Sequence, residues 1–336
     1  MNIKKCFDIN VIGGGKRIPE VDVAKGIGIV LVVLAHCCGG TLPSNVINSF
    51  HMPLFFCLSG LFLFRKNESF RDFINKKAKC LLFPCLVFGI LLSTYSTTLD
   101  YVRGESEIPL GLRYVGLFIN TRHNPYPGSL WFFLALFLVE LMLYFIHKTI
   151  RSSAFRLIVV WAISVMGCLY NQKYKVGLPW SLDIAFICIL FTEFGYMCKQ
   201  YGVLSHNSLV KAVLLLVIFT VTFSLNVVVL GYNVNLFSSD YGCYPLFYLT
   251  ALSGTYIVYS LSCIIKHNRL LQYLGQNSLL IYSLHFLLLL VVSITYSHIP
   301  INGIFSSVAQ TITILLLLIP VINIINKHFT WMTGKF

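Results

Sequence analysis

The chain has 336 residues, of which 57% are hydrophobic and only 11% are charged. An average soluble domain carries roughly 25% charged residues, so water is not the main solvent of this protein. The formal net charge of +13 would suggest nucleic acid binding in a soluble chain, but in a membrane protein it reflects topology and contact with anionic lipid headgroups. Nucleic acid is therefore excluded as a partner, and membrane lipid is expected around the chain.

Apolar stretches recur along the whole length and predict about ten transmembrane helices. A bilayer core about 30 Å thick needs roughly 20 mainly apolar residues in a helix. The stretches lack the period-two alternation of a β-barrel, so the expected fold class is all-α and polytopic. The second and fifth stretches are short for a crossing. The predicted spans are residues 23–38, 46–64, 80–97, 129–147, 155–169, 178–198, 209–230, 244–265, 279–296 and 304–325.

Basic residues are distributed unevenly between the two sides of this arrangement. An even number of spans puts both termini on one side, and the positive-inside rule identifies it as the cytoplasm. All but five of the 25 basic residues then lie inside. The sequence predicts a multi-pass protein of the cell inner (plasma) membrane, with a cytoplasmic segment 1–22, a transmembrane domain 23–326 and a cytoplasmic tail 327–336. The five outside residues are Arg103, Arg113, Arg122, Lys173 and Lys175.

The cysteines do not form a recognisable framework. Most of the eleven lie in or at the ends of apolar stretches, and no Cys-x-x-Cys occurs. They are interpreted as small apolar core residues, so neither a metal site nor a disulfide scaffold is predicted.

Asp22, Lys25 and His36 stand out in the first predicted helix, because ionisable groups inside apolar helices are costly. Eleven residues from Lys25 to His36 are about three turns, so both project from one face, roughly 16 Å apart along the axis. Gly26 and Gly28 thin the helix near Lys25 and allow close approach of another helix or a ligand. A histidine can take a proton from an attacking hydroxyl or carry an acyl group itself. A cation near the end of the helix can bind phosphates. Asp22, three residues before Lys25, is within reach to pair with it.

Other ionisable residues fall in later apolar stretches. For each of them the alternative to a functional role is an interface residue that is solvated or bonded to a neighbouring helix. These residues are His51, Glu140, Asp183, Glu193 and His285.

Two predicted connections also carry candidate binding residues. The inside segment 65–79 is the densest basic stretch and is interpreted as a site for donor phosphates or as topogenic charge. The long outside connection 96–128 is interpreted as a sugar-binding loop or as a solvated connector. Its polar groups and aromatic residues, with Tyr126 near its end and Trp131 just beyond it, suit a sugar.

Several blocks resemble the acyltransferase family 3 membrane proteins. Residues 17–36 are similar to the opening signature, in which a basic residue, ten others and a histidine are diagnostic, here Lys25 and His36. The stretch 50–60, with His51, Pro53 and Ser59, is similar to the second-helix block, especially that of the fucose 4-O-acetylase-like branch. Residues 73–84 resemble the basic stretch that leads into helix three, and residues 129–132 resemble the start of helix four. Residues 281–285 are more weakly similar to a late-helix block.

This resemblance implies an O-acetyltransferase that moves an acetyl or similar short acyl group from cytoplasmic acetyl-CoA to a hydroxyl of a glycan acceptor, such as a surface polysaccharide, a lipopolysaccharide or a lipid-linked repeat. The family often has arginine where this chain has Lys25; lysine keeps the charge but loses the bidentate fork. The implied sites are catalytic His36, His51 and Asp22; donor-binding Lys25, Arg65, Lys76, Lys77 and Lys79; and acceptor-side Tyr126, Trp131, Glu140 and His285.

Two other classes of function are considered. A glycan transporter or flippase would also have many helices with buried charge, but it would favour paired half-length helices in two related halves, which the sequence does not show. A non-catalytic ligand-binding module on the same membrane scaffold would not need both Lys25 and His36. The presence of both residues therefore argues against this class.

Overall fold

The computed structural model describes residues 18–64, 68–104, 109–119, 130–203 and 209–334, and these residues are helical apart from turns and one isolated bridge between Asn235 and Asp240. The all-α prediction is confirmed. Within the described ranges, nine helices are long and apolar enough to cross a membrane, so the protein is a polytopic membrane protein. They are α1 (Pro19–Cys38), α4 (Phe70–Lys77) continued by η3 (Ala78–Leu82) and α5 (Phe83–Arg103), α7 (Trp131–Thr149), α8 (Ser153–Tyr174), η5 (Pro179–Ser181) with α9 (Leu182–Gln200), α10 (Leu209–Phe223) with η7 (Ser224–Val229), α11 (Tyr244–Ile264), α13 (Ser278–Ser297) and α14 (Gly303–His328).

The second predicted span differs from the prediction, because it is broken into α2 (Leu42–Asn48) and α3 (His51–Gly60). Pro53 explains the break. It has no N–H to donate to the carbonyl of Ser49, and its ring would collide with that carbonyl in a continuous helix. Both short helices contact α1, and α3 also contacts α11.

The outside connection predicted over residues 96–128 begins later than expected, because α5 continues to Arg103 and a further helix, α6 (Leu110–Ile119), follows. The hydroxyl groups of Thr94, Thr97 and Thr98 donate to backbone carbonyls one turn earlier. These bonds satisfy the threonine donors within the helix, so the polar residues do not end it. It ends at Gly104, which takes a left-handed conformation with φ +71°.

The chain divides into two compact units. The first unit comprises Met1–Glu68, Leu190–Leu236 and Asp240–Ser278, and the second comprises Ser69–Ile189, Phe237–Ser239 and Leu279–Phe336. Helix α9 contributes its first part to the second unit and its later part to the first.

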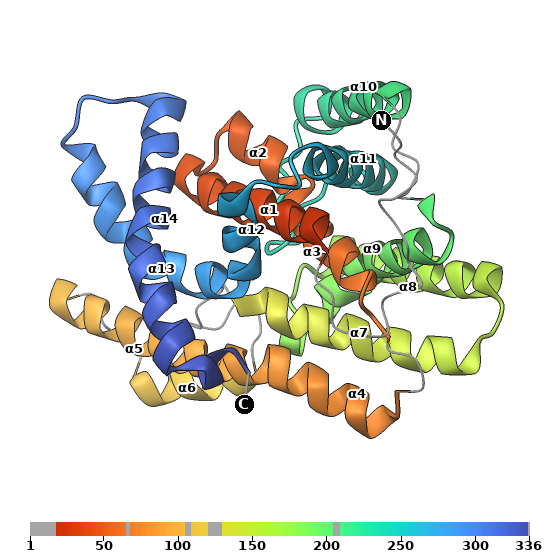
Figure 1. Cartoon of the computed structure of the whole chain (residues 1–336), viewed down its shortest axis with the longest axis horizontal. Coiled ribbons are helices and arrows are strands. Elements are labelled where there is room, and N and C mark those ends of the chain that lie inside the picture. Colours follow the sequence, from red (N-terminus) through yellow and green to blue (C-terminus); the bar gives the residue numbers. More distant parts are fainter. Residues whose placement is uncertain (1–17, 65–67, 105–108, 120–129, 204–208, 335–336) are drawn as a thin grey trace. The chain divides into compact units, whose positions relative to one another are not determined.

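Helix α1 is the centre of the first unit and contacts α2, α3, α11 and α12 (Arg269–Gln276) (Figure 1). A Cβ added at Gly26 would collide with the carbonyl oxygen of Leu271, and one at Gly275 with that of Asp22. The close approach predicted at Gly26 is therefore confirmed, with α12 as the neighbour. These contacts fix the first turns of α1, which carry Asp22 and Lys25.

In the second unit, α7 lies against several elements. The rings of Phe132 and Phe133 both contact Tyr282 of α13 edge-on, with centroids 5.6 and 5.4 Å apart. Helix α7 also contacts η3. Helix α5 contacts both α6 and the terminal η8 (Thr330–Thr333).

Candidate functional site

His36 and His51 lie together in the first unit. His36 is near the end of α1 and is exposed, whereas His51 opens α3 and is buried. The helices that carry them, α1 and α3, contact each other. His51 donates its Nδ1–H to the carbonyl oxygen of Ile47 at 2.9 Å. In the neutral ring this leaves the lone pair on Nε2, which can accept a proton or a hydrogen bond.

Lys25 and His36 occupy the same uninterrupted helix. Because α1 runs from Pro19 to Cys38 as one α-helix, the step of eleven residues from Lys25 to His36 makes about three turns and both side chains share a face. The predicted common face is confirmed. A cationic group and an imidazole are thus spaced along one rigid element.

The ammonium group of Lys25 lies 5.7 Å from the ring centroid of Phe62, in the turn that follows α3. The ammonium group of Lys199, on the last turn of α9, lies 5.9 Å from the same centroid. All three side chains are half-buried. We call Lys25 and Lys199 the Phe62 lysine pair. Two cations near one apolar ring attract an anion with an extended form, such as a diphosphate.

The sequence had shown Lys199 only as one of many cytoplasmic charges. Its place at the end of an apolar stretch was visible, but its proximity to Phe62 was not, because the two residues are far apart in the chain. Lys199 and Phe62 are the site residues that the sequence interpretation missed.

The first turn of α1 is tied to its neighbours by polar contacts. Gln276 donates its side-chain amide to the carboxylate of Asp22 at 2.9 Å. The ammonium group of Lys266 lies 3.7 Å from the carboxylate of Glu20. These contacts hold the end of α1 that carries Lys25. The predicted pairing of Asp22 with Lys25 stays a prediction.

The predicted donor-binding lysines of the second unit, Lys76, Lys77 and Lys79, differ in how far they are buried. Lys77 is buried, and its ammonium group lies 2.5 Å from the carboxylate of Glu140 on α7. Lys76 is half-buried and Lys79 is exposed, while Arg65 lies outside the described residues. Glu140, expected on the acceptor side, is the counter-ion of Lys77. Donor binding by Lys76 and Lys79 stays a prediction.

The remaining predicted acceptor-side residues are in the second unit or outside the described residues. Trp131 is buried at the start of α7. His285 is fully buried on α13 and donates its Nδ1–H to the carbonyl oxygen of Ile281 at 3.0 Å, the same local bond that His51 makes. Tyr126 lies outside the described residues. Their role toward an acceptor stays a prediction.

Asp183 has a local structural role. Its carboxylate accepts hydrogen bonds from the backbone N–H of Leu178 at 3.0 Å and from the hydroxyl of Ser239 at 3.4 Å. It stabilises the start of α9, so its burial does not require a catalytic explanation. Glu193, on the same helix, is fully buried in the first unit.

Comparison with known proteins identifies one family. The family model Acyl_transf_3, described as an acyltransferase domain, matches residues 18–326. This range begins just before α1 and ends within the last turns of α14. No curated protein and no solved structure matches the chain.

Proposed function

Because the chain belongs to acyltransferase family 3, we propose that it transfers an acetyl or similar short acyl group from cytoplasmic acetyl-CoA to a hydroxyl of a surface polysaccharide or lipid-linked glycan. The observation that carries the proposal is the placement of Lys25 and His36 on one face of α1, with His51 on the contacting helix α3. We place the chain in the fucose 4-O-acetylase-like branch, because residues 50–60 are most similar to that branch.

The Phe62 lysine pair is the proposed donor site. Lys25 and Lys199 would attract the donor's phosphates, and the ring of Phe62 would form an apolar wall between them. The contacts of Asp22 with Gln276 support this end of α1. In the predicted topology this is the cytoplasmic end, where acetyl-CoA is available.

His36 is the proposed catalytic base. It takes the proton of the acceptor hydroxyl as the hydroxyl oxygen bonds to the carbonyl carbon of the thioester. The carbon–sulfur bond then breaks, and the thiolate that leaves takes this proton from His36. His51 assists through its Nε2 lone pair, since its Nδ1–H is already bonded to Ile47. If His36 carries the acyl group itself, its nitrogen first forms an acyl-imidazole as the thiolate leaves. The acceptor hydroxyl then displaces the imidazole, which takes up the hydroxyl proton.

The spacing along α1 fits a donor whose phosphates and thioester are far apart. Lys25 and His36 are separated by roughly 16 Å along the helix axis. The flexible arm that joins the phosphates to the thioester in acetyl-CoA would run along the face that these residues share.

Two measurements test the proposal. Mass spectrometry of surface glycans from cells with and without the gene should show a loss of one acyl group per repeat when the gene is removed. Purified protein in detergent should transfer label from acetyl-labelled CoA to those deacylated glycans. Glycans of unchanged mass, together with no transfer by purified folded protein, would contradict it.

A further inference from the structure

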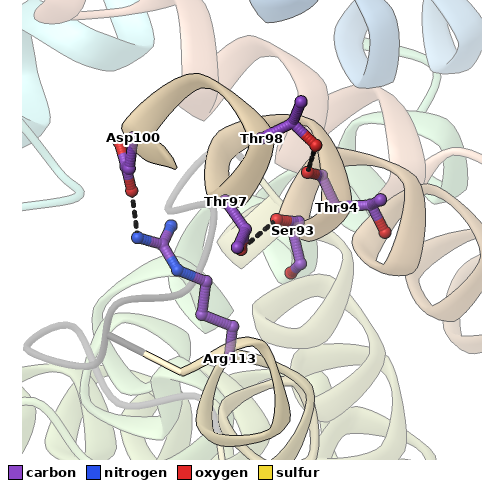
Figure 2. Close-up of polar contacts among 6 residues, drawn as sticks. All are labelled: Ser93, Thr94, Thr97, Thr98, Asp100 and Arg113. Carbon is purple, nitrogen blue, oxygen red and sulfur yellow. Dashed lines mark hydrogen bonds and ion pairs between the residues drawn. The ribbon is translucent and has the colours of Figure 1, made fainter. Parts of the chain in front are cut away.

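A polar stripe runs along one face of α5 in the second unit. Ser93, Thr97 and Asp100 are spaced four and three residues apart, so they follow one face of the helix for roughly 10 Å (Figure 2). Ser93 is fully buried, Thr97 is half-buried and the side chain of Asp100 is 27% exposed. Along the stripe the side chains therefore pass from partly exposed at Asp100 to fully buried at Ser93. Buried polar groups in a membrane helix are costly and usually have a function.

Helix α6 covers this stripe with two polar side chains. Arg113 is buried and donates through Nη2 to the carboxylate of Asp100, as Figure 2 shows. Tyr114, the next residue, has its hydroxyl 2.8 Å from that of Thr94 on the neighbouring face of α5. The charges of Arg113 and Asp100 cancel, so the stripe presents hydrogen-bonding groups without net charge.

The stripe has both donors and acceptors to offer. Thr97 uses its hydroxyl proton on the carbonyl oxygen of Ser93 at 2.9 Å, which leaves its oxygen lone pairs as acceptors. The carboxylate of Asp100 has acceptor capacity beyond its bond to Arg113. Two buried donors have no hydrogen-bond partner among the residues that the structure describes: the hydroxyl of Ser93 and Nε–H of Arg113. Since buried polar groups in native proteins are almost always hydrogen-bonded, these two donors can each take an acceptor from a ligand.

We propose that the polar stripe of Ser93, Thr97 and Asp100, with Arg113, binds a neutral sugar residue of the acceptor. A sugar hydroxyl both donates and accepts, so it can accept from Ser93 or Arg113 and donate to Thr97 or Asp100. Asp100 disfavours an anionic ligand, and Arg113 disfavours a cationic one. The inference rests on the proposed function, for which it names the acceptor class and the residues that recognise it. The predicted topology puts this end of α5 outside, where a surface glycan would be.

Saturation-transfer NMR on the full chain in detergent tests binding without any acyl transfer. The probes are methyl glycosides of neutral hexoses and deoxyhexoses, with methyl glucuronide and methyl glucosaminide as the anionic and cationic probes. We expect at least one neutral glycoside to bind with a Kd in the millimolar range, and more tightly than either charged probe. Binding of the charged probes alone would overturn the proposal.

Two variants and one control assign the binding to the stripe. Ser93→Ala removes one unpartnered donor, and Arg113→Lys keeps the charge opposite Asp100 but removes Nε–H. Each should weaken neutral glycoside binding about five-fold, the effect of one lost hydrogen bond. Thr98→Val removes an exposed hydroxyl from another face of α5 and should leave binding unchanged. Equal binding by the parent and the first two variants would mean that only water fills the stripe.

The same assay separates this inference from the proposed function. His267→Ala protein, which loses an exposed histidine that has no part in the proposed chemistry, should bind the glycoside like the parent. If glycoside binding depends on Ser93 but the protein acylates nothing, the proposal that the stripe binds a sugar is supported and the proposal of acyl transfer fails. If the protein acylates glycan while binding is independent of Ser93 and Arg113, the stripe proposal fails alone.

Discussion

The two units hold their lysines in contrasting surroundings. Lys199 of the first unit lies 5.9 Å from the centroid of the Phe62 ring. Lys77 of the second unit lies 2.5 Å from the carboxylate of Glu140 and is buried with it. An aromatic ring attracts an ammonium group without cancelling its charge, whereas a carboxylate cancels it. The number of basic residues in a segment therefore does not locate a phosphate site; the groups that face each cation do.

The largest expected effect concerns the histidines of the two units. His36→Ala should reduce acyl transfer by about 10²- to 10⁴-fold, the usual contribution of a general base. The measurement is the kcat of purified, folded protein with saturating acetyl-CoA. His267→Ala, which removes an exposed histidine of the first unit, should retain the parent rate.

The second unit provides the alternative location for the chemistry. If His36→Ala protein acylates glycan at near the parent rate while His285→Ala protein does not, the base is on α13 and the model of α1 is wrong.

The next largest effect should be on stability rather than on activity. Lys77→Ala or Glu140→Ala leaves an uncompensated charge in the second unit, which should cost about 3–5 kcal/mol of unfolding free energy. The double replacement Lys77→Met with Glu140→Leu should restore most of that loss, because an apolar pair of similar volume needs no counter-ion. Chemical unfolding in detergent micelles measures both.

Lys79→Ala is the matched control, since Lys79 is exposed in the adjoining η3, and it should change the free energy by less than about 0.5 kcal/mol. If Lys77→Ala protein is as stable as the parent but has a raised KM for acetyl-CoA, Lys77 binds the donor and is not a structural counter-ion.

The sequence allowed good prediction of features that lie along one helix. The common face of Lys25 and His36 needs only the helical period, and the close approach at Gly26 needs only the absence of a side chain. The break before His51 was not predicted, because the length of the apolar stretch hid the effect of Pro53. The continuation of α5 to Arg103 was also missed, since threonines that bond to their own helix look like loop residues in a sequence.

Features that join distant segments were beyond the sequence. Lys77 and Glu140 are 63 residues apart, so the burial of Lys77 was not visible in a stretch of exposed-looking lysines. Lys199 is brought to Phe62 by the packing of α9 beside α3. The pairing of Arg113 with Asp100 required a helix, α6, in a segment interpreted as a connection.

A smaller effect is expected from glycines in the two units. Gly26→Ala would put a Cβ into the carbonyl oxygen of Leu271, and the resulting shift of α1 against α12 should cost about 1–3 kcal/mol. Gly111→Ala on α6 meets no atom within 4 Å and should instead stabilise the helix by about 0.5–1 kcal/mol. Unfolding in detergent compares the two, and equal stability of both variants would contradict the close contact of α1 with α12.

The smallest effect expected on activity would establish whether the Phe62 lysine pair holds the donor. Lys199→Gln should raise the KM for acetyl-CoA about ten-fold, since one charge-assisted contact is lost. The KM for the acceptor and the kcat should change little, because the lost interaction is equally present in the ground state and the transition state. Lys199→Arg keeps the charge and should restore most of the donor affinity. Lys211 is an exposed lysine of the first unit on α10, and the Lys211→Gln protein should behave like the parent.

Replacing Lys76 and Lys79 together with glutamine provides the opposing test in the second unit. A raised donor KM in that variant, with none in Lys199→Gln, would move the donor site to the lysines of α4 and η3 and reverse the contrast between the units.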